Sequence, residues 1–425
     1  MRAPRVLRLT ALVAGLGLAS AGFAGAAADP VTGVAAPAAA PAAPAAFTPT
    51  AGLPGQRNAV TDVPGVQVGQ VQNRTSPFLT GTSVLYFPTM AVASVDQRGG
   101  APATKETDLL SPLNSNPGVN AVQLGGSSMY GLSATDGIIR WLEDRGEGVP
   151  LGSVGVAPIV PAADIYDLGR GGDIKARTGP EWGYVAASNV AGAAVRQGAF
   201  GGGTGARAGG LKGGVGTASV YLGDGIYVGA VVVVNSAGSP VDPKTCQLLG
   251  AQFGIGDEFA GLKAPTQAEC QTVASAAKSD DLNTTIAVVV TNAPLEKAAA
   301  QRMSGNAHDG MARAIRPIHT LADGDTVFAV STGQGEPLRI NDPADSRQLN
   351  AIFGAGADTL SRAIAKAMLS ADSVGGITSY CDRYPSACAD VPQAAKWRAA
   401  GPAKEMTPRL FDDARQALQV TPLPR

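Results

Sequence analysis

The residue in this chain best placed to supply chemistry is a Thr at the start of an apolar strand pattern. Asn283-Thr284 ends a polar segment without periodicity, and the apolar residues 286–290 follow at once. A Thr hydroxyl here can attack the carbonyl of the preceding residue, and an N→O acyl shift followed by hydrolysis frees the Thr amine. That amine has a pKa well below that of a Lys side chain and can act as general base for its own hydroxyl. The pattern predicts self-cleavage between Asn283 and Thr284, although the same dipeptide before a strand is usually an ordinary turn.

The scarcity of histidine limits the alternatives to this chemistry. Two His residues in a chain of 425 exclude a His-rich metal site. His308 lies on an apolar helical stripe with Met311, which is typical of a core residue, and His319 stands just before a turn. We therefore expect both to be structural, and no Ser-His-Asp triad. A Thr whose own amine is the base needs no His, and we expect neither a metal nor a cofactor.

Other motifs fail because of their context. Residues 201–212 are rich in Gly but do not match a phosphate-binding P-loop, because Leu211 separates the last Gly from Lys212 and no Ser or Thr follows the Lys. They do not match a dinucleotide-binding motif either, because a predicted helix and not a strand precedes them. Residues 275–278 match S-x-x-K without the S-D-N or K-T-G companions of that motif. The formal charge of −1, from 33 basic and 34 acidic residues, argues against a nucleic-acid partner.

The N-terminal residues predict an exported, periplasmic or secreted protein. Three Arg residues precede an apolar run at residues 9–21, and small residues typical of an A-x-A cleavage site follow it. This order predicts a signal peptide over residues 1–28, with no membrane span after its removal. Residues 29–56 are rich in Ala and Pro and predict an extended linker.

Four cysteines agree with an oxidising compartment. They are Cys246, Cys270, Cys381 and Cys388, and their number alone allows three pairings. We expect nearest neighbours to pair, because each pair lies within one irregular stretch. Four unpaired thiols are the alternative, and a zinc site is disfavoured because no C-x2-C pair is present.

The pattern of apolar residues predicts a layered α/β domain over residues 57–370. A hairpin is expected from residues 215–221 and 226–234, and residues 230–234 and 286–290 are apolar on both faces, which is typical of strands buried between layers. Further strands are expected at 65–69, 82–87 and 326–331, and helices from Ala134, over 180–195, after Pro294 and over 349–364. Residues 371–425 are polar and contain Pro, so we expect a peripheral extension.

Several ordered sequence blocks carry a resemblance to a known family. They are NAVTDVPGV (58–66), GGSSMYGL (125–132), YDLGRG (166–171), GTGA (203–206) with GGLKGGVG (209–216), and the Asn283-Thr284 step followed by its strand and TNAPL (291–295). The chain resembles the L-aminopeptidase/D-esterase family of self-processing amidohydrolases, which includes nylon-oligomer hydrolases. The resemblance covers about residues 57–370 and is specific as a set, since each block alone is weak.

The resemblance implies a fold and a set of site residues. The fold is a four-layer αββα sandwich like that of the N-terminal-nucleophile hydrolases. Thr284 matches the nucleophile, Asn283 the residue before the cut, Asn235 a donor to the substrate carbonyl, Lys212 and Tyr166 polar residues of the pocket, and Asp323 and Asp325 the pair that positions the nucleophile's amine. Without the resemblance these residues have ordinary interpretations: a turn for Asp323 and Asp325, a strand exit for Asn235, a solvated charge for Lys212 and a packing residue for Tyr166.

The sequence also departs from the aminopeptidase branch of that family. The branch has Gly-Ser at the cut and a later Ser-x-Glu pair, whereas Asn-Thr and Asp-x-Asp resemble the nylon-oligomer branch. The main hypothesis is an exported, self-processing amide hydrolase or aminopeptidase acting on small peptides or amides, assembled as a homo-oligomer of processed heterodimers. The alternatives are an endo-type amide-oligomer hydrolase, a serine hydrolase using Ser127 or Ser128, and a non-catalytic exported binding protein with the same fold.

Overall fold

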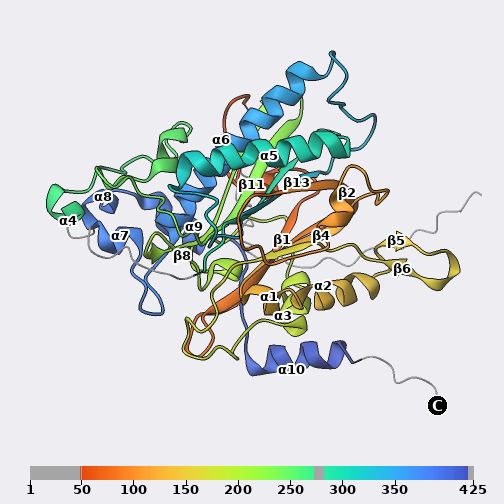
Figure 1. Ribbon diagram of the computed structural model, residues 1–425, viewed down its shortest axis with the longest axis horizontal. Helices are drawn as coiled ribbons and strands as arrows, with labels where there is room; N and C mark the ends of the chain where they lie inside the picture. Colours follow the sequence, from red (N-terminus) through yellow and green to blue (C-terminus); the bar gives the residue numbers. More distant parts are fainter. Residues whose placement is uncertain (1–47, 49, 272–281, 420–425) are drawn as a thin grey trace, which may run out of the picture. The chain divides into compact units, whose positions relative to one another are not determined.

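Figure 1 shows the computed structural model, which describes residues 48, 50–271 and 282–419. The predicted signal peptide (1–28), most of the predicted linker (29–56) and the S-x-x-K motif (275–278) lie outside the described residues. Within the described ranges, no helix has both the length and the apolar character needed to cross a membrane.

Strand β2 (Thr80–Gln97) connects two sheets into one ten-stranded arrangement. Its first half pairs with β1 (Gln67–Asn73) and β4 (Val119–Gly125), and its second half pairs with β13 (Thr326–Ser331). The first sheet contains, in order, β10 (Gly214–Gly223), β11 (Ile226–Val234), β12 (Ile286–Thr291), β13 and the second half of β2. The second sheet contains β14 (Lys404–Glu405), β1, the first half of β2, β4, β7 (Ala162–Asp164) and β3 (Thr104–Lys105).

The strands of the first sheet are apolar on both faces because both faces are covered. In β11, Val232 and Val234 belong to the core beneath the helices, whereas Val231 and Val233 belong to the core between the two sheets. The same alternation holds along β12. Successive side chains of a strand point to opposite faces, so a doubly covered strand needs apolar residues throughout. The predicted burial of these two strands is confirmed.

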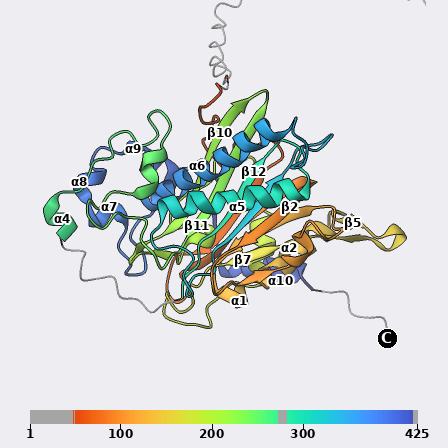
Figure 2. The same cartoon turned by 45° about the horizontal axis from the view of Figure 1, so that its top comes forward.

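Helices cover the outer face of each sheet. The long helices α5 (Lys297–Ala314) and α6 (Ser346–Ser370) contribute to one core with the first sheet. On the other side, α2 (Ala134–Glu143), α3 (Pro180–Ala187) and α10 (Pro408–Ala417) share a core with the second sheet. Figures 1 and 2 show these two helical layers on opposite sides of the strands. Three separate cores between four layers confirm the predicted αββα sandwich.

Helix α3 is shorter than the sequence pattern predicts. A helix was expected over residues 180–195, but α3 ends at Ala187. The backbone N–H and carbonyl groups of Ala191 instead form hydrogen bonds of 3.1 and 3.0 Å with Val68 of β1. An Ala-rich sequence is compatible with a helix, and here pairing with a strand edge overrides that local preference.

The C-terminal residues are integrated into the fold, unlike the peripheral extension expected from their polarity. Tyr380 and Tyr384 are at most 1% exposed and belong to the core under α6. Strand β14 pairs in parallel with β1, with Val71 opposite Lys404. The rings of Tyr380 and Tyr384 lie 5.0 Å apart, measured between centroids, and both are buried although the sequence around them is polar.

The remaining elements are short. The 3-10 helices are η1 (Val60–Asp62), η2 (Asp108–Leu110), η3 (Gly152–Val154), η4 (Gly201–Gly203) and η5 (Leu249–Phe253). The short strands are β5 (Val149–Pro150), β6 (Val156–Ala157), β8 (Arg207–Ala208) and β9 (Leu211–Lys212), and the short α-helices are α1 (Ser128–Gly131), α4 (Gln267–Gln271), α7 (Tyr380–Arg383), α8 (Pro385–Cys388) and α9 (Pro392–Ala399).

Candidate active site

The topology of the first sheet brings the predicted site residues to one edge. Strands β11 and β12 are antiparallel, so the end of β11 lies beside the start of β12, where Val233 pairs with Ile286. Strands β12 and β13 are parallel, so both begin at this edge, where Ile286 pairs with Thr326. Residues just after β11 and just before β12 and β13 therefore meet, although up to 90 positions separate them along the chain.

Thr284 is held beside the peptide bond that precedes it. Its side chain is buried, its N–H donates to the Asn235 carbonyl oxygen at 2.6 Å, and its hydroxyl donates to the Asn283 carbonyl oxygen. The Gly324 N–H donates to the same Asn283 oxygen at 3.2 Å. A backbone donor aimed at a carbonyl oxygen stabilises negative charge that develops there. The arrangement places a hydroxyl and an oxyanion donor at one carbonyl.

Two carboxylates hold the backbone around Thr284. One oxygen of Asp325 accepts from the Thr285 N–H at 2.7 Å, and Oδ1 of Asp323 accepts from the Ala237 N–H at 2.9 Å. The other Asp323 oxygen accepts from the Thr320 hydroxyl at 2.5 Å. Burial, followed by the negative charge of Asp325, raises the pKa of Asp323. Both carboxylates are engaged by backbone amides in the uncut chain.

Asn235 joins Thr284 to a neighbouring loop. Its side-chain oxygen accepts from the Arg170 guanidinium and from the Arg207 N–H, the latter at 2.9 Å. Its side-chain NH2 donates to the Tyr166 carbonyl oxygen at 3.3 Å. The backbone of Tyr166 therefore contributes the contact, and its half-buried side chain takes no part in it. Arg170 lies in the block YDLGRG (166–171) but was not singled out, because its contact with Asn235, 65 positions away, exists only in the folded chain.

Lys212 supports the loops around the site rather than Thr284 itself. It is fully buried, and Nζ donates to the carbonyl oxygens of Gly203, Ala206 and Gly213 at 2.9 to 3.0 Å. Burial lowers the pKa of Lys212 to about 7, while three carbonyl acceptors favour the protonated form. The interpretation of Lys212 as a solvated loop charge is wrong, because the Gly-rich loop folds over it.

The two histidines lie together near the site. His308 is buried, with Nε2 2.9 Å from the Asp96 carbonyl oxygen, and burial lowers its pKa to about 4. His319 contacts Asp325 through Nδ1 at 2.8 Å, and its ring lies 4.7 Å from that of His308, measured between centroids. A core position for His308 agrees with its helical stripe. The contact of His319 with Asp325 was not foreseen, because it depends on a turn that reverses the chain.

The alternative nucleophile Ser127 is enclosed by other contacts. Its oxygen accepts from the Thr178 N–H at 2.9 Å and lies 3.2 Å from the Thr80 hydroxyl. Its N–H donates to Asp167 at 2.6 Å, and burial raises the pKa of that carboxyl group to about 6. Ser127 is 1% exposed, so its side chain is buried among these contacts.

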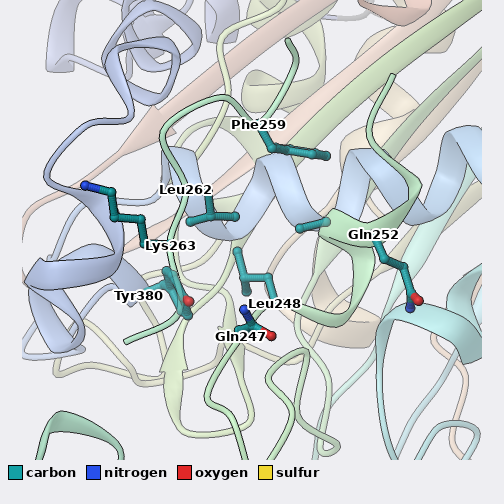
Figure 3. A pocket seen from close by; sticks show the side chains of 8 residues that line it. Gln247, Leu248, Gln252, Phe259, Leu262, Lys263 and Tyr380 are labelled. Carbon is teal, nitrogen blue, oxygen red and sulfur yellow. The ribbon is translucent and has the colours of Figure 1, made fainter. Parts of the chain in front are cut away.

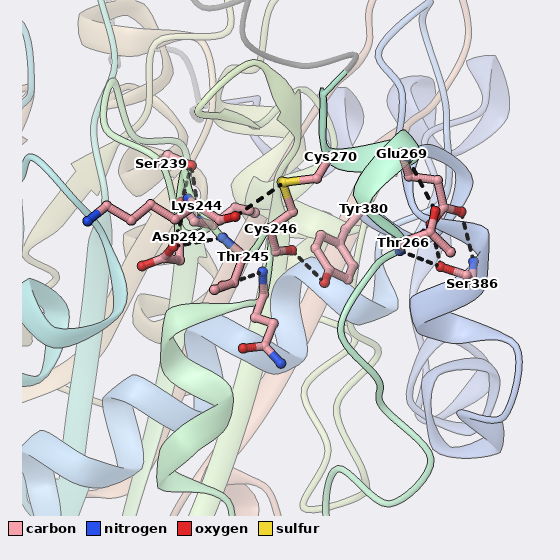
Figure 4. Close-up of a disulfide and its surroundings, with 12 residues drawn as sticks. Ser239, Asp242, Lys244, Thr245, Cys246, Thr266, Glu269, Cys270, Tyr380 and Ser386 are labelled. Carbon is pink, nitrogen blue, oxygen red and sulfur yellow. Dashed lines mark hydrogen bonds between the residues drawn. A yellow bond between two sulfur atoms is a disulfide. The ribbon is translucent and has the colours of Figure 1, made fainter.

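The cysteines pair as nearest neighbours, Cys246 with Cys270 and Cys381 with Cys388. The Tyr380 hydroxyl donates to the Cys246 carbonyl oxygen at 3.0 Å, as Figure 4 shows. Glu269 accepts from the Ser386 N–H at 3.1 Å. These contacts fasten the segment before the predicted cut to the C-terminal helices.

A hollow of about 350 Å³ lies between this segment and α7 (Figure 3). Its lining includes Leu248, Phe259, Leu262 and Tyr380 and does not include Thr284. Since Thr284 is 3% exposed, the predicted nucleophile is covered in the uncut chain. Within the described ranges, no group of three or more His, Cys, Asp or Glu side chains is arranged to hold a metal ion.

Comparison with known proteins identifies the family. The profile described as peptidase family S58 matches residues 58–381. This chain belongs to peptidase family S58. The S58 match covers most of the sandwich and every predicted catalytic and cleavage-site residue.

Relatives and a solved structure agree with the S58 assignment. An uncharacterized aminopeptidase of Mycobacterium leprae is 46% identical over 350 residues, covering 78% of this chain and 95% of the relative. The 6-aminohexanoate-oligomer endohydrolase of a Kocuria species is 30% identical over 303 residues, covering 66% and 76%. The structure of the L-aminopeptidase D-Ala-esterase/amidase from Ochrobactrum anthropi superposes with a TM-score of 0.62 at 23% identity, covering 81% and 96%, and is described as a variant of the Ntn hydrolase fold.

These similarities decide the class of enzyme. The S58 chain is a peptidase or amide hydrolase with the Ntn hydrolase fold. A peptide or other amide substrate follows from the family.

Proposed function

We propose that this S58 enzyme cleaves its own chain between Asn283 and Thr284 and then uses Thr284 as an N-terminal nucleophile on small amides. The observation that carries the proposal is the hydroxyl of Thr284 beside the Asn283 carbonyl, whose oxygen also accepts from the Gly324 N–H at 3.2 Å. The family membership supports the amide-hydrolase chemistry, and the contacts support the choice of residue.

The cleavage step follows from these contacts. The Thr284 oxygen bonds to the Asn283 carbonyl carbon, the Gly324 N–H holds the oxyanion, and the carbon–nitrogen bond then breaks. The hydroxyl proton ends on the departing nitrogen, and the Asn283 acyl group is left as an ester on Thr284. Water hydrolyses that ester, which yields a carboxylate on Asn283 and a free amine on Thr284.

The same site would then hydrolyse a substrate amide. The Thr284 amine takes the hydroxyl proton, the oxygen attacks the substrate carbonyl, and an acyl-enzyme forms and is released by water. Asp323 and Asp325, which hold Ala237 and Thr285, keep the new terminus in place. We assign the carbonyl-polarising role to Asn235 with the Gly324 N–H, and a supporting role to Lys212 and Tyr166.

Self-cleavage is tested with Thr284→Ala and two matched controls. Wild type should give a trailing chain of 142 residues that begins at Thr284, seen on a denaturing gel and by N-terminal sequencing. Thr284→Ala should remain uncut and inactive, Thr284→Ser should be cut, and Thr285→Ala should be cut because the Thr285 hydroxyl has no partner among the described residues. A single intact chain in active wild-type protein would overturn the proposal.

Two kinds of relative point to two different substrate classes for this enzyme. The relative at 46% identity is named an aminopeptidase, and the one at 30% is named an oligomer endohydrolase. The Asn-Thr step and the Asp323–Asp325 pair favour the second kind, whereas overall identity favours the first. Assays of processed enzyme on amino-acid amides, with and without a free α-amine, and on linear amide oligomers separate exo from endo action.

Export and assembly complete the proposal. A signal peptide over residues 1–28 and two disulfides are compatible with a periplasmic or secreted enzyme. We expect the processed chains to form heterodimers that associate into a homo-oligomer. Sequencing the mature N-terminus and measuring the mass of the native particle test the two statements separately.

A further inference from the structure

His319 contacts Asp325, the carboxylate that accepts a hydrogen bond from the Thr285 N–H, and its backbone conformation is constrained. Its backbone has a φ of +59°, and its side chain is 19% exposed. Both its N–H and its Nδ1 lie within hydrogen-bond distance of the same Asp325 oxygen, at 3.0 and 2.8 Å. A non-glycine residue with positive φ is uncommon and is maintained only when its surroundings determine it strongly.

The hydrogen-bond partners assign the proton on each ring. The Asp96 carbonyl oxygen only accepts, so His308 carries its proton on Nε2, 2.9 Å away. Asp325 accepts from the Thr285 N–H as a carboxylate, so His319 carries its proton on Nδ1. The opposite nitrogens, Nδ1 of His308 and Nε2 of His319, are buried without a hydrogen-bond partner among the described residues. Through its ring, His319 thus forms a hydrogen bond with Asp325 and with no other group among the described residues.

The two oxygens of Asp325 have separate tasks. Oδ1 accepts from the Thr285 N–H at 2.7 Å, and Oδ2 accepts both donors of His319. The carboxylate is fully buried, so its orientation depends on these donors and not on water. Because Thr285 follows the nucleophile directly, the orientation of Asp325 sets the position of the Thr284 backbone.

We propose that His319 is a positioning residue for the Thr284 site, which it serves by donating from Nδ1 to Asp325. The inference rests on the proposed function of Thr284. His319 does not touch the reacting atoms; it fixes the carboxylate that fixes the backbone of the nucleophile. A hydrogen bond to a buried carboxylate is among the stronger ones in proteins, so its loss has a measurable effect on rate.

The test compares variants that differ in where they place a donor. Asn places its NH2 near the position of Nδ1 and tolerates positive φ, whereas Gln places it farther out and Gly removes it. We expect His319→Asn to self-cleave and turn over within about threefold of wild type, and His319→Gln and His319→Gly to lose about tenfold or more in both rates, with KM changed little. Equal rates in all three variants, or no rescue by Asn, would overturn the proposal.

A matched control separates positioning from packing. His308→Gln keeps an amide donor for the Asp96 carbonyl and perturbs the same pair of rings without touching Asp325. We expect wild-type kcat in His308→Gln; an equal loss there would assign the effect to packing and overturn the proposal. Thermal unfolding of each variant shows whether it is folded, and His319→Asn keeps the test decisive if His319→Gly unfolds.

The proposed function and this inference fail in different ways. If wild type is not cut, or if Thr284→Ala remains active, the function of Thr284 is wrong. If wild type is cut in a Thr284-dependent way while His319→Gln behaves like wild type, only the positioning role is wrong.

Discussion

At the scale of single residues, the environment of Thr284 consists mainly of backbone groups. Its N–H is held by the Asn235 carbonyl, and the carbonyl it contacts is held by the Gly324 N–H. Side chains enter mostly as supports for that backbone, as Asp325 does for Thr285. Backbone donors set by neighbouring strands are rigid, which suits the stabilisation of a developing charge.

Gly324 is the residue whose substitution should disturb this arrangement most directly. A Cβ on Gly324 would lie 2.9 Å from the Thr284 hydroxyl oxygen and 2.6 Å from the Ala101 carbonyl oxygen. We expect Gly324→Ala to slow self-cleavage by about tenfold to a hundredfold, since small displacements of a reacting group cost rates of this order.

The rate of appearance of the trailing chain measures this effect. Gly354→Ala is the control, because nothing lies within 4 Å of its added Cβ on α6. It should cleave normally and be more stable by about 0.5–1 kcal/mol, the usual gain for Ala over Gly in a helix. Normal cleavage in Gly324→Ala would show that the turn can shift without affecting Thr284.

His308 should make stability depend on pH. Burial lowers its folded-state pKa to about 4, below the usual 6.5, so the unfolded chain binds a proton that the folded chain excludes in this window. The stabilisation is complete above the higher pKa and is lost as the pH falls toward the lower one.

Denaturant unfolding measures the size of this loss. Between about pH 7 and about pH 4.5 the free energy of unfolding should fall by about 2–3 kcal/mol through His308. In His308→Gln, which does not titrate, the decrease over the same interval should be smaller by that amount. Identical pH profiles for the two proteins would contradict the lowered pKa.

At the scale of elements, a buried ion cluster attaches α6 to the rest of the sandwich. Glu258 accepts from Arg362 at 2.6 Å and from the Asn58 side chain at 2.7 Å, and Lys366 lies 3.8 Å away. Glu258, Arg362 and Lys366 are at most 1% exposed at their side chains. Burial lowers the pKa of Lys366 to about 7. The cluster joins α6 to Asn58 near the start of the domain and to the irregular segment after β11 that contains Glu258.

Removing the negative charge should destabilise the fold. Glu258→Gln removes the carboxylate that pairs with the buried Arg362 and Lys366 charges, and we expect a loss of about 3–5 kcal/mol in the free energy of unfolding. The exposed pair Lys263–Asp390 is the control, since Asp390→Asn should change the unfolding midpoint little. Similar small effects for both variants would mean that water reaches the cluster.

At the scale of the whole molecule, the proposed cut between Asn283 and Thr284 would divide the chain without separating its parts. The trailing chain contributes β12 and β13, and these strands pair with β11 and β2 of the leading chain. Two chains that alternate within one sheet cannot separate without exposing its core. The processed chains should therefore elute together under native conditions.

The positions of the disulfides predict that no covalent bond links the two processed chains. Cys246 and Cys270 both lie before the cut, and Cys381 and Cys388 both lie after it. We expect a non-reducing denaturing gel of processed protein to show two separate chains, the same as a reducing gel. A band of full-length mass that disappears on reduction would instead require a disulfide between the chains, such as Cys246 with Cys381.

The local sequence pattern predicted the strands of the first sheet well, because both faces of these strands are covered by other layers. The hairpin of β10 and β11 and the strands β12 and β13 follow from apolar runs that only a doubly covered strand contains. The same reasoning made α3 too long and the C-terminal residues peripheral, because the Ala191 pairing and the Tyr380 burial depend on elements distant in sequence.

By itself, the sequence predicted a layered α/β domain and pointed to the Asn283-Thr284 step as the place for a chemistry that needs no His base, and its ordered blocks, through the family resemblance, implied the αββα order of layers. These predictions depend on residue types, periodicity and short motifs, each read along one stretch of chain. Only the tertiary structure decided that Gly324 donates to the Asn283 carbonyl, that Lys212 is enclosed, and that His319 supports Asp325. Those contacts join residues through strand register and turns, and neither is encoded in any short segment.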